Sequence, residues 1–136
     1  MNRVLMIEDS DDDIEMAQRV FAKAGLSGTV CVCRDGTQAL DFLLGRGAYA
    51  AEKPGADIRL ILLDLNLPKT SGLDVLREIR LNPLTRQIPI AVLTVSTKEP
   101  DLLQCFTMGI KDYLVKPLEP ARFAEIYRKF VQEGQT

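Results

Sequence analysis

The sequence alternates short runs of consecutive apolar residues with longer segments in which apolar residues recur at helical spacing. The first run, Val4–Ile7, shows no polar alternation, which is typical of a central parallel strand covered on both faces. Further strands are expected at Thr29–Cys33, Ile58–Leu63, Pro89–Leu93 and Tyr113–Val115. The expected helices contain Ile14–Ala24, Ala39–Leu44, Gly72–Leu81, Glu99–Met108 and Phe123–Val131. This alternation predicts an α/β fold: a doubly wound, five-stranded parallel sheet with helices on both faces and strand order 2-1-3-4-5.

The length and charge of the chain exclude several classes of protein. With 136 residues, the whole of 1–136 is expected to form one domain, in which 46–57 is a surface loop. A net charge of −2 argues against a surface that binds nucleic acid through phosphate contacts. No apolar run approaches the roughly 18 residues of a membrane span, and the N-terminal run is too short for a secretory signal. We therefore expect a cytoplasmic protein with neither nucleic acid nor membrane as partner.

Small polar groups stand where the predicted strands end. Glu8 and Asp9 follow the first strand, Asp64 follows the third, Thr94 the fourth and Lys116 the fifth. In open α/β sheets, ligands bind outside the carboxyl ends of the strands. The sequence therefore predicts one site at this edge of the sheet.

The predicted site requires a counter-charge, because Glu8, Asp9 and Asp64 would raise one another's pKa if they lay close together. A donor set of oxygens alone points to Mg²⁺, with Glu8, Asp9, Asp64 and the backbone carbonyl of Asn66 as candidate ligands. With Lys116 added, the predicted site is neutral by charge count. Such a site is suited to accept a phosphoryl group on Asp64, as an aspartyl phosphate. The Lys116-Pro117 bond is a candidate cis peptide.

These motifs together resemble the receiver domain of two-component response regulators over essentially the whole chain. The matching segments are Val4–Asp9, Leu62–Pro68 with Gly72, Leu93-Thr94 and Tyr113–Pro117. The resemblance implies the flavodoxin-like receiver architecture, with Asp64 as phosphoacceptor from a phosphohistidine on a sensor histidine kinase. It also implies that Lys116 and Thr94 contact the phosphoryl group and that Thr94 and Tyr113 form a switch. The expected output is contact with a downstream protein or onward phosphotransfer, with no attached output domain.

A finer resemblance is to the stand-alone regulators that partner phytochromes. It rests on the long loop 45–57, on Asp64–Lys69, and on Val92–Thr94 followed by Ser96-Thr97. It implies a phytochrome-linked phosphorelay and a homodimer through the fourth helix, fifth strand and fifth helix. The chain departs from the general pattern at Val95, where a small residue usually follows the threonine. A branched side chain there is expected to narrow the access of phosphate.

Other functions share parts of this pattern. A flavodoxin-like carrier would need a hydroxyl-rich phosphate loop, and the acidic Glu8–Asp11 would repel a flavin phosphate. An Mg-dependent aspartyl phosphatase would need an acid where Asn66 stands. A receiver-like binding module that is never phosphorylated is the main alternative. We expect no enzyme acting on an external substrate, and at most self-phosphotransfer and autodephosphorylation. The acidic run Asp11–Asp13 is expected to be a solvated helix start.

Overall fold

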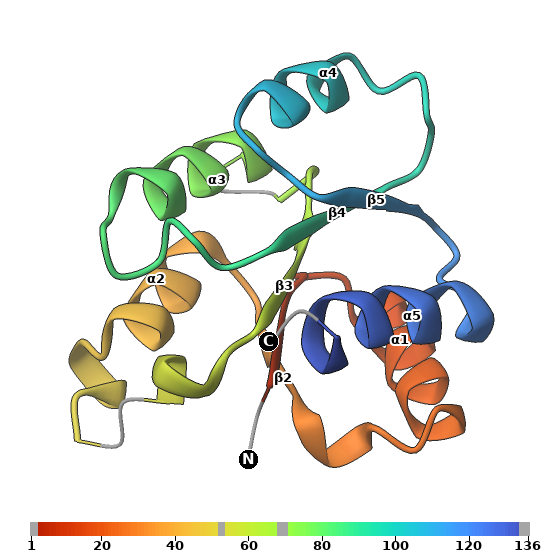
Figure 1. The fold of residues 1–136 in the computed structure, drawn as a ribbon, viewed down its shortest axis with the longest axis horizontal. Helices are drawn as coiled ribbons and strands as arrows, with labels where there is room; N and C mark the ends of the chain where they lie inside the picture. Colours follow the sequence, from red (N-terminus) through yellow and green to blue (C-terminus); the bar gives the residue numbers. More distant parts are fainter. Residues whose placement is uncertain (1–2, 52–53, 68–70, 134–136) are drawn as a thin grey trace.

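The computed structural model describes residues 3–51, 54–67 and 71–133, and within them the strands form one parallel sheet (Figure 1). The strand order is β2-β1-β3-β4-β5, as the sequence predicts. All neighbouring strands pair in parallel. The strands are β1 Val4–Ile7, β2 Val30–Cys33, β3 Leu60–Asp64, β4 Ile90–Thr94 and β5 Asp112–Val115.

Helices cover both faces of the sheet. The helices are α1 Asp11–Lys23, α2 Gly36–Leu44, α3 Gly72–Leu81, α4 Pro100–Thr107 and α5 Pro120–Tyr127. Figure 1 shows α1 and α5 side by side on one face, with α2, α3 and α4 on the other. Three of the described helices have an N-cap residue whose side chain accepts a hydrogen bond from a backbone N–H of the first turn. Such a bond stabilises the start of a helix. These N-cap residues are Ser10, Asp35 and Ser71.

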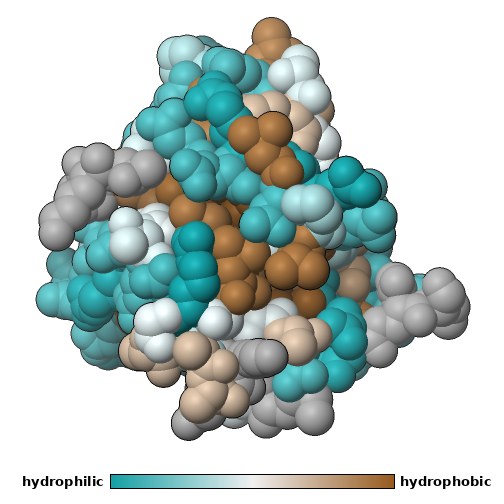
Figure 2. Space-filling model, turned by 90° about the vertical axis from the view of Figure 1, so that its left-hand side faces the viewer, coloured by the Kyte–Doolittle hydropathy of each residue, from teal (hydrophilic) through white to brown (hydrophobic). Residues whose placement is uncertain are grey.

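Among the residues that the structure describes, the core consists of two hydrophobic clusters, one on each face of the sheet. Successive side chains of a strand point to opposite faces, so Leu5 and Ile7 belong to the cluster under α2, α3 and α4. Val4 and Met6 belong to the cluster under α1 and α5. Figure 2, which views the side of α2 and α3, shows hydrophobic side chains gathered near the centre of that surface.

The element boundaries differ from the predicted ones in ways that matter for the site. Asp64 is the last residue of β3 and Thr94 the last residue of β4, because their backbones continue the ladder one residue beyond the apolar run. The predicted surface loop contains two short 3₁₀ turns, Gly47–Tyr49 and Pro54–Asp57. The last helix continues as a π-helical turn over Arg128–Gln132. None of the described helices is both long and apolar enough to cross a bilayer.

Gly72, at the start of α3, lies against the end of β3, which gives a prediction about stability. A Cβ atom at this position would lie 2.5 Å from the carbonyl oxygen of Asp64 and 2.6 Å from the Cα of Leu65. Gly72→Ala is therefore expected to lower the free energy of unfolding by about 1–3 kcal/mol, because backbone must shift. Urea denaturation measures this change.

Gly28→Ala is the matched control, since a Cβ atom at Gly28 would meet nothing within 4 Å. Its effect is expected to stay within about 0.5 kcal/mol. Equal stability of the two variants would contradict the close approach of α3 to β3.

Candidate functional site

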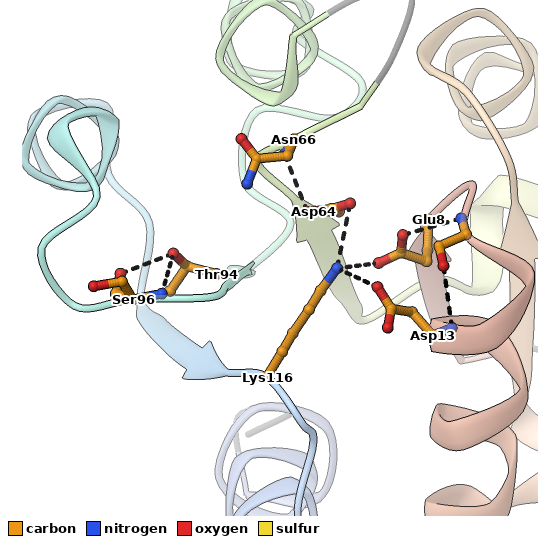
Figure 3. Close-up of polar contacts among 8 residues, drawn as sticks. Glu8, Asp13, Asp64, Asn66, Thr94, Ser96 and Lys116 are labelled. Carbon is orange, nitrogen blue, oxygen red and sulfur yellow. Dashed lines mark hydrogen bonds and ion pairs between the residues drawn. The ribbon is translucent and has the colours of Figure 1, made fainter.

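The carboxyl ends of four strands bring the predicted site residues to one edge of the sheet (Figure 3). Ile7 of β1 pairs with Leu63 of β3, so the next residues, Glu8 and Asp64, lie at the same level. Thr94 of β4 pairs with Val115 of β5, which places Lys116 one residue beyond the sheet. The register of the strands thus gathers residues from both ends of the chain.

Three carboxylates meet at this edge. Glu8, Asp9 and Asp64 each offer an oxygen, and these oxygens all lie within 4.8 Å of one another. Glu8 and Asp64 are buried, whereas Asp9 is partly exposed. This is the cluster that the sequence predicts.

Lys116 supplies positive charge to the cluster. Its Nζ atom lies 2.8 Å from Oε2 of Glu8, 2.9 Å from Oδ2 of Asp13 and 3.4 Å from Oδ2 of Asp64 (Figure 3). Burial alone would lower the pKa of Lys116, but the contacts with Asp13 and Glu8 and the charge of Asp64 outweigh burial and raise it. Lys116 is therefore a firmly protonated ammonium. The Lys116-Pro117 bond is cis, as predicted.

The two carboxylate oxygens of Glu8 have different partners. Its Oε1 atom accepts a hydrogen bond from the backbone N–H of Ser10 at 3.2 Å. Its Oε2 atom is buried and, within the described part of the chain, has the ion pair with Lys116 but no well-directed hydrogen bond. Burial raises the pKa of Glu8, the contact with the Lys116 ammonium opposes this rise, and the charge of Asp64 adds to it. A set of oxygen donors with one undersatisfied buried carboxylate fits Mg²⁺.

Asp64 is fixed at the centre of the cluster. Its Oδ1 atom accepts a hydrogen bond from the backbone N–H of Asn66 at 3.0 Å, and its Oδ2 atom faces Lys116. The side chain of Asn66 is exposed at the rim of the site (Figure 3). The predicted role of the Asn66 carbonyl as a metal ligand stays a prediction. Pro68 and Lys69 of the same motif lie outside the described residues.

Thr94 is close to the cluster in the fold but is bonded elsewhere. Its hydroxyl donates to the carbonyl oxygen of Ser96 at 2.9 Å and accepts from the backbone N–H of Ser96 at 3.3 Å (Figure 3). Val95, between them, has an exposed side chain. Tyr113 of β5 is half-buried, and its ring meets Phe106 of α4 edge-on, with 6.2 Å between ring centroids.

The expectation that Asp13 belongs to a solvated helix start is wrong. Its carboxylate pairs with Lys116, so the site contains a fourth carboxylate, and the predicted neutral charge count does not hold. Helical spacing is the signal that could have identified it, since Asp13 precedes the buried Ala17 and Phe21 by one and two turns. Asp11, by contrast, pairs with the exposed Arg34 at the end of β2.

The raised pKa of Glu8 predicts how stability depends on pH. The folded protein binds the carboxyl proton of Glu8 more tightly than the unfolded chain does, since an unperturbed glutamate has a pKa of 4.5. The resulting stabilisation is complete below pH 4.5 and is lost as the pH rises through the raised pKa. Glu8→Gln removes this loss. The free energy of unfolding of Glu8→Gln should therefore rise relative to that of the wild type as the pH increases above 4.5.

Urea denaturation without divalent cations tests this dependence. Glu78→Gln, at an exposed position of α3, is the control for loss of a surface charge. A difference between Glu8→Gln and wild type that does not change with pH would contradict the prediction.

Comparisons with known proteins agree with this geometry. The family model described as the response regulator receiver domain matches residues 4–128. Response regulator Rcp1 of Synechocystis sp. is 39% identical over 114 residues, which cover 83% of this chain and 75% of that protein.

Two solved structures share the fold over nearly the whole chain. The Mn(2+)-bound form of response regulator Rcp1 has a TM-score of 0.79 and 33% identity, covering 100% of this chain and 98% of that one. The phosphorylated cyanobacterial phytochrome response regulator RcpA has a TM-score of 0.78 and 32% identity, covering 99% and 96%. The chain therefore belongs to the response regulator receiver domain family.

Proposed function

We propose that this chain is a response regulator that accepts a phosphoryl group on Asp64 from a sensor histidine kinase, in a reaction that requires Mg²⁺. The observation that carries the proposal is the buried Asp64 carboxylate, which lies 3.4 Å from the Lys116 ammonium and within one acidic cluster with Glu8 and Asp9. The similar Rcp1 was solved with Mn²⁺ and the similar RcpA was solved phosphorylated, which supports the same chemistry here.

In the proposed reaction, a carboxylate oxygen of Asp64 attacks the phosphorus atom. The bond between phosphorus and the histidine nitrogen breaks, and its electron pair stays on the leaving imidazole. Lys116 holds positive charge beside the transferred oxygens, while Glu8 and Asp9 would hold Mg²⁺. Bound Mg²⁺ would supply further positive charge to the phosphoryl oxygens.

Replacing the acceptor tests the proposal directly. Asp64→Asn is expected to abolish labelling by acetyl phosphate, because a neutral amide is not a nucleophile for phosphoryl transfer. Intact-mass spectrometry with and without Mg²⁺ measures the label, which should be lost on treatment with hydroxylamine, as for an acyl phosphate.

Asp12→Asn is the matched control, since Asp12 is an exposed aspartate in the same acidic run. It is expected to be labelled like the wild type. Labelling of Asp64→Asn would refute the assignment, and an unlabelled wild type would favour the alternative of a binding module that is never phosphorylated.

The proposed switch follows from the resting position of Thr94. Its hydroxyl is bonded to Ser96, so it would have to leave that residue to reach a phosphoryl group on Asp64. Such a movement would pull the segment between β4 and α4, and Tyr113 could then leave its edge contact with Phe106. The surface around α4 and β5 would change with phosphorylation, which is how a regulator alters its contacts with other proteins.

The partner we propose is a phytochrome-type sensor histidine kinase acting in the cytoplasm, because RcpA is a phytochrome response regulator. The acidic set beside Asp64 and the family match favour this function over a flavin carrier or a phosphatase. Val95 is exposed and follows Thr94 at the end of β4, and we propose that it slows the access of phosphate or of hydrolytic water to Asp64.

The surface of α4, β5 and α5 is also proposed as the interface of a homodimer. Leu103 is 76% exposed, and Phe106 and Val115 are exposed as well. Leu103→Glu is expected to shift the protein towards monomer, because a carboxylate would be desolvated at an apolar interface. Sedimentation velocity measures this shift.

Leu84→Glu is the control, since Leu84 is 78% exposed but lies between α3 and β4. It should leave the oligomeric state unchanged. An unchanged dimer in Leu103→Glu would contradict this interface.

A further inference from the structure

We propose that Asp13 is a positioning residue that holds the Lys116 ammonium away from the metal ligands when a divalent cation binds. This inference rests on the function proposed above, since it concerns the metal site of that reaction. Asp13 is not a metal ligand in this proposal, and it acts through Lys116.

The contacts of Lys116 separate Asp13 from the other carboxylates. The Nζ atom contacts Glu8, Asp64 and Asp13. Glu8 and Asp64, together with Asp9, form the cluster whose oxygens could hold one cation, and within the described residues Asp13 does not belong to it. Lys116 therefore shares two partners with the cation and has one partner of its own.

The shared partners create competition. Oε2 of Glu8 is buried and, among the described residues, has no hydrogen-bond partner beside its ion pair with Lys116. Of the three carboxylate oxygens that Nζ contacts, it is the closest, at 2.8 Å. A dication bound to these oxygens repels the ammonium. It also neutralises part of their negative charge, so they attract the ammonium less. Lys116 then gives up the shared oxygens more easily if another carboxylate retains its ammonium, and Asp13 is placed to do so.

The position of Asp13 suits an anchor. It lies in the first turn of α1, and its backbone N–H donates to the Ser10 hydroxyl at 3.3 Å, which fixes the turn. The side chain of Lys116 is 17% exposed and that of Asp13 is 36% exposed, so water only partly screens the pair. Asp13 is therefore held by a helix start rather than by the cation cluster.

A double-mutant cycle tests this role by the affinity for Mg²⁺ alone, measured by isothermal titration calorimetry on the whole chain. Asp13→Asn is expected to weaken Mg²⁺ binding about fivefold, because Lys116 then competes fully for Glu8 and Asp64. Asp12→Asn, which removes the same charge from an exposed position one residue earlier, is expected to change the affinity little. Asp13→Glu should restore much of it.

The cycle separates action through Lys116 from direct attraction between Asp13 and the cation. Lys116→Met is expected to bind Mg²⁺ more tightly than the wild type, since the competing ammonium is gone. In that background, Asp13→Asn should have no larger effect than Asp12→Asn. The inference would be overturned if Asp13→Asn weakened Mg²⁺ binding by the full amount in the Lys116→Met background. It would also be overturned if Asp13→Asn and Asp12→Asn bound Mg²⁺ equally well with Lys116 present.

The outcome also distinguishes this inference from the proposed function. If the wild type is labelled on Asp64 and binds Mg²⁺ but the coupling is absent, the role of Asp13 alone is overturned. If the wild type binds no Mg²⁺, the proposed function fails and the inference fails with it.

Discussion

The ion pairs of Lys116 hold together a site whose carboxylates would otherwise repel one another. The ammonium contacts Glu8, Asp13 and Asp64 at 2.8–3.4 Å. Glu8 and Asp64 are nearly inaccessible to water, so their charges are costly unless a cation compensates them. One side chain near the C-terminal end thus makes the acidic residues of the N-terminal half compatible with a folded state.

The parallel sheet is what makes this convergence possible. The pairing of Ile7 with Leu63 and of Thr94 with Val115 brings the ends of β1, β3, β4 and β5 level with one another. The backbone N–H of Lys116 donates to the carbonyl oxygen of Thr94 at 2.8 Å, which extends the ladder to the lysine itself. Below these charged ends, β1, β3 and β4 are buried along their whole length and pack into both hydrophobic clusters.

The same strands connect the proposed chemistry with the proposed switch. Thr94 ends β4 beside Asp64, and Tyr113 lies on the neighbouring strand β5 with its ring against α4. In the structure, the Thr94 hydroxyl is bonded to Ser96 and not to the acidic cluster. The Thr94 hydroxyl is therefore turned to its own loop, and it would reach a phosphoryl group on Asp64 only after a rearrangement of that loop.

The sequence alone determined the sheet and most of the site, because both depend on local patterns. Unbroken apolar runs marked the buried strands, and the polar residues after them marked the carboxyl edge where Glu8, Asp9, Asp64 and Lys116 gather. The receiver family followed from the order and spacing of those residues. The predicted ends of β3 and β4 fall one residue short, since Asp64 and Thr94 join the ladder through backbone pairing that their side chains do not signal.

The tertiary structure alone decided which charges meet. Helical spacing separates Asp13 from its two neighbouring aspartates, but it does not name a partner. Only the docking of α1 against the sheet brings Asp13 to Lys116, while Asp11 pairs with Arg34. The bond between Thr94 and Ser96 likewise depends on the path of the loop after β4. Local pattern specifies which elements form and which edge is polar, whereas ion pairs between distant residues depend on distances that only the packed fold sets.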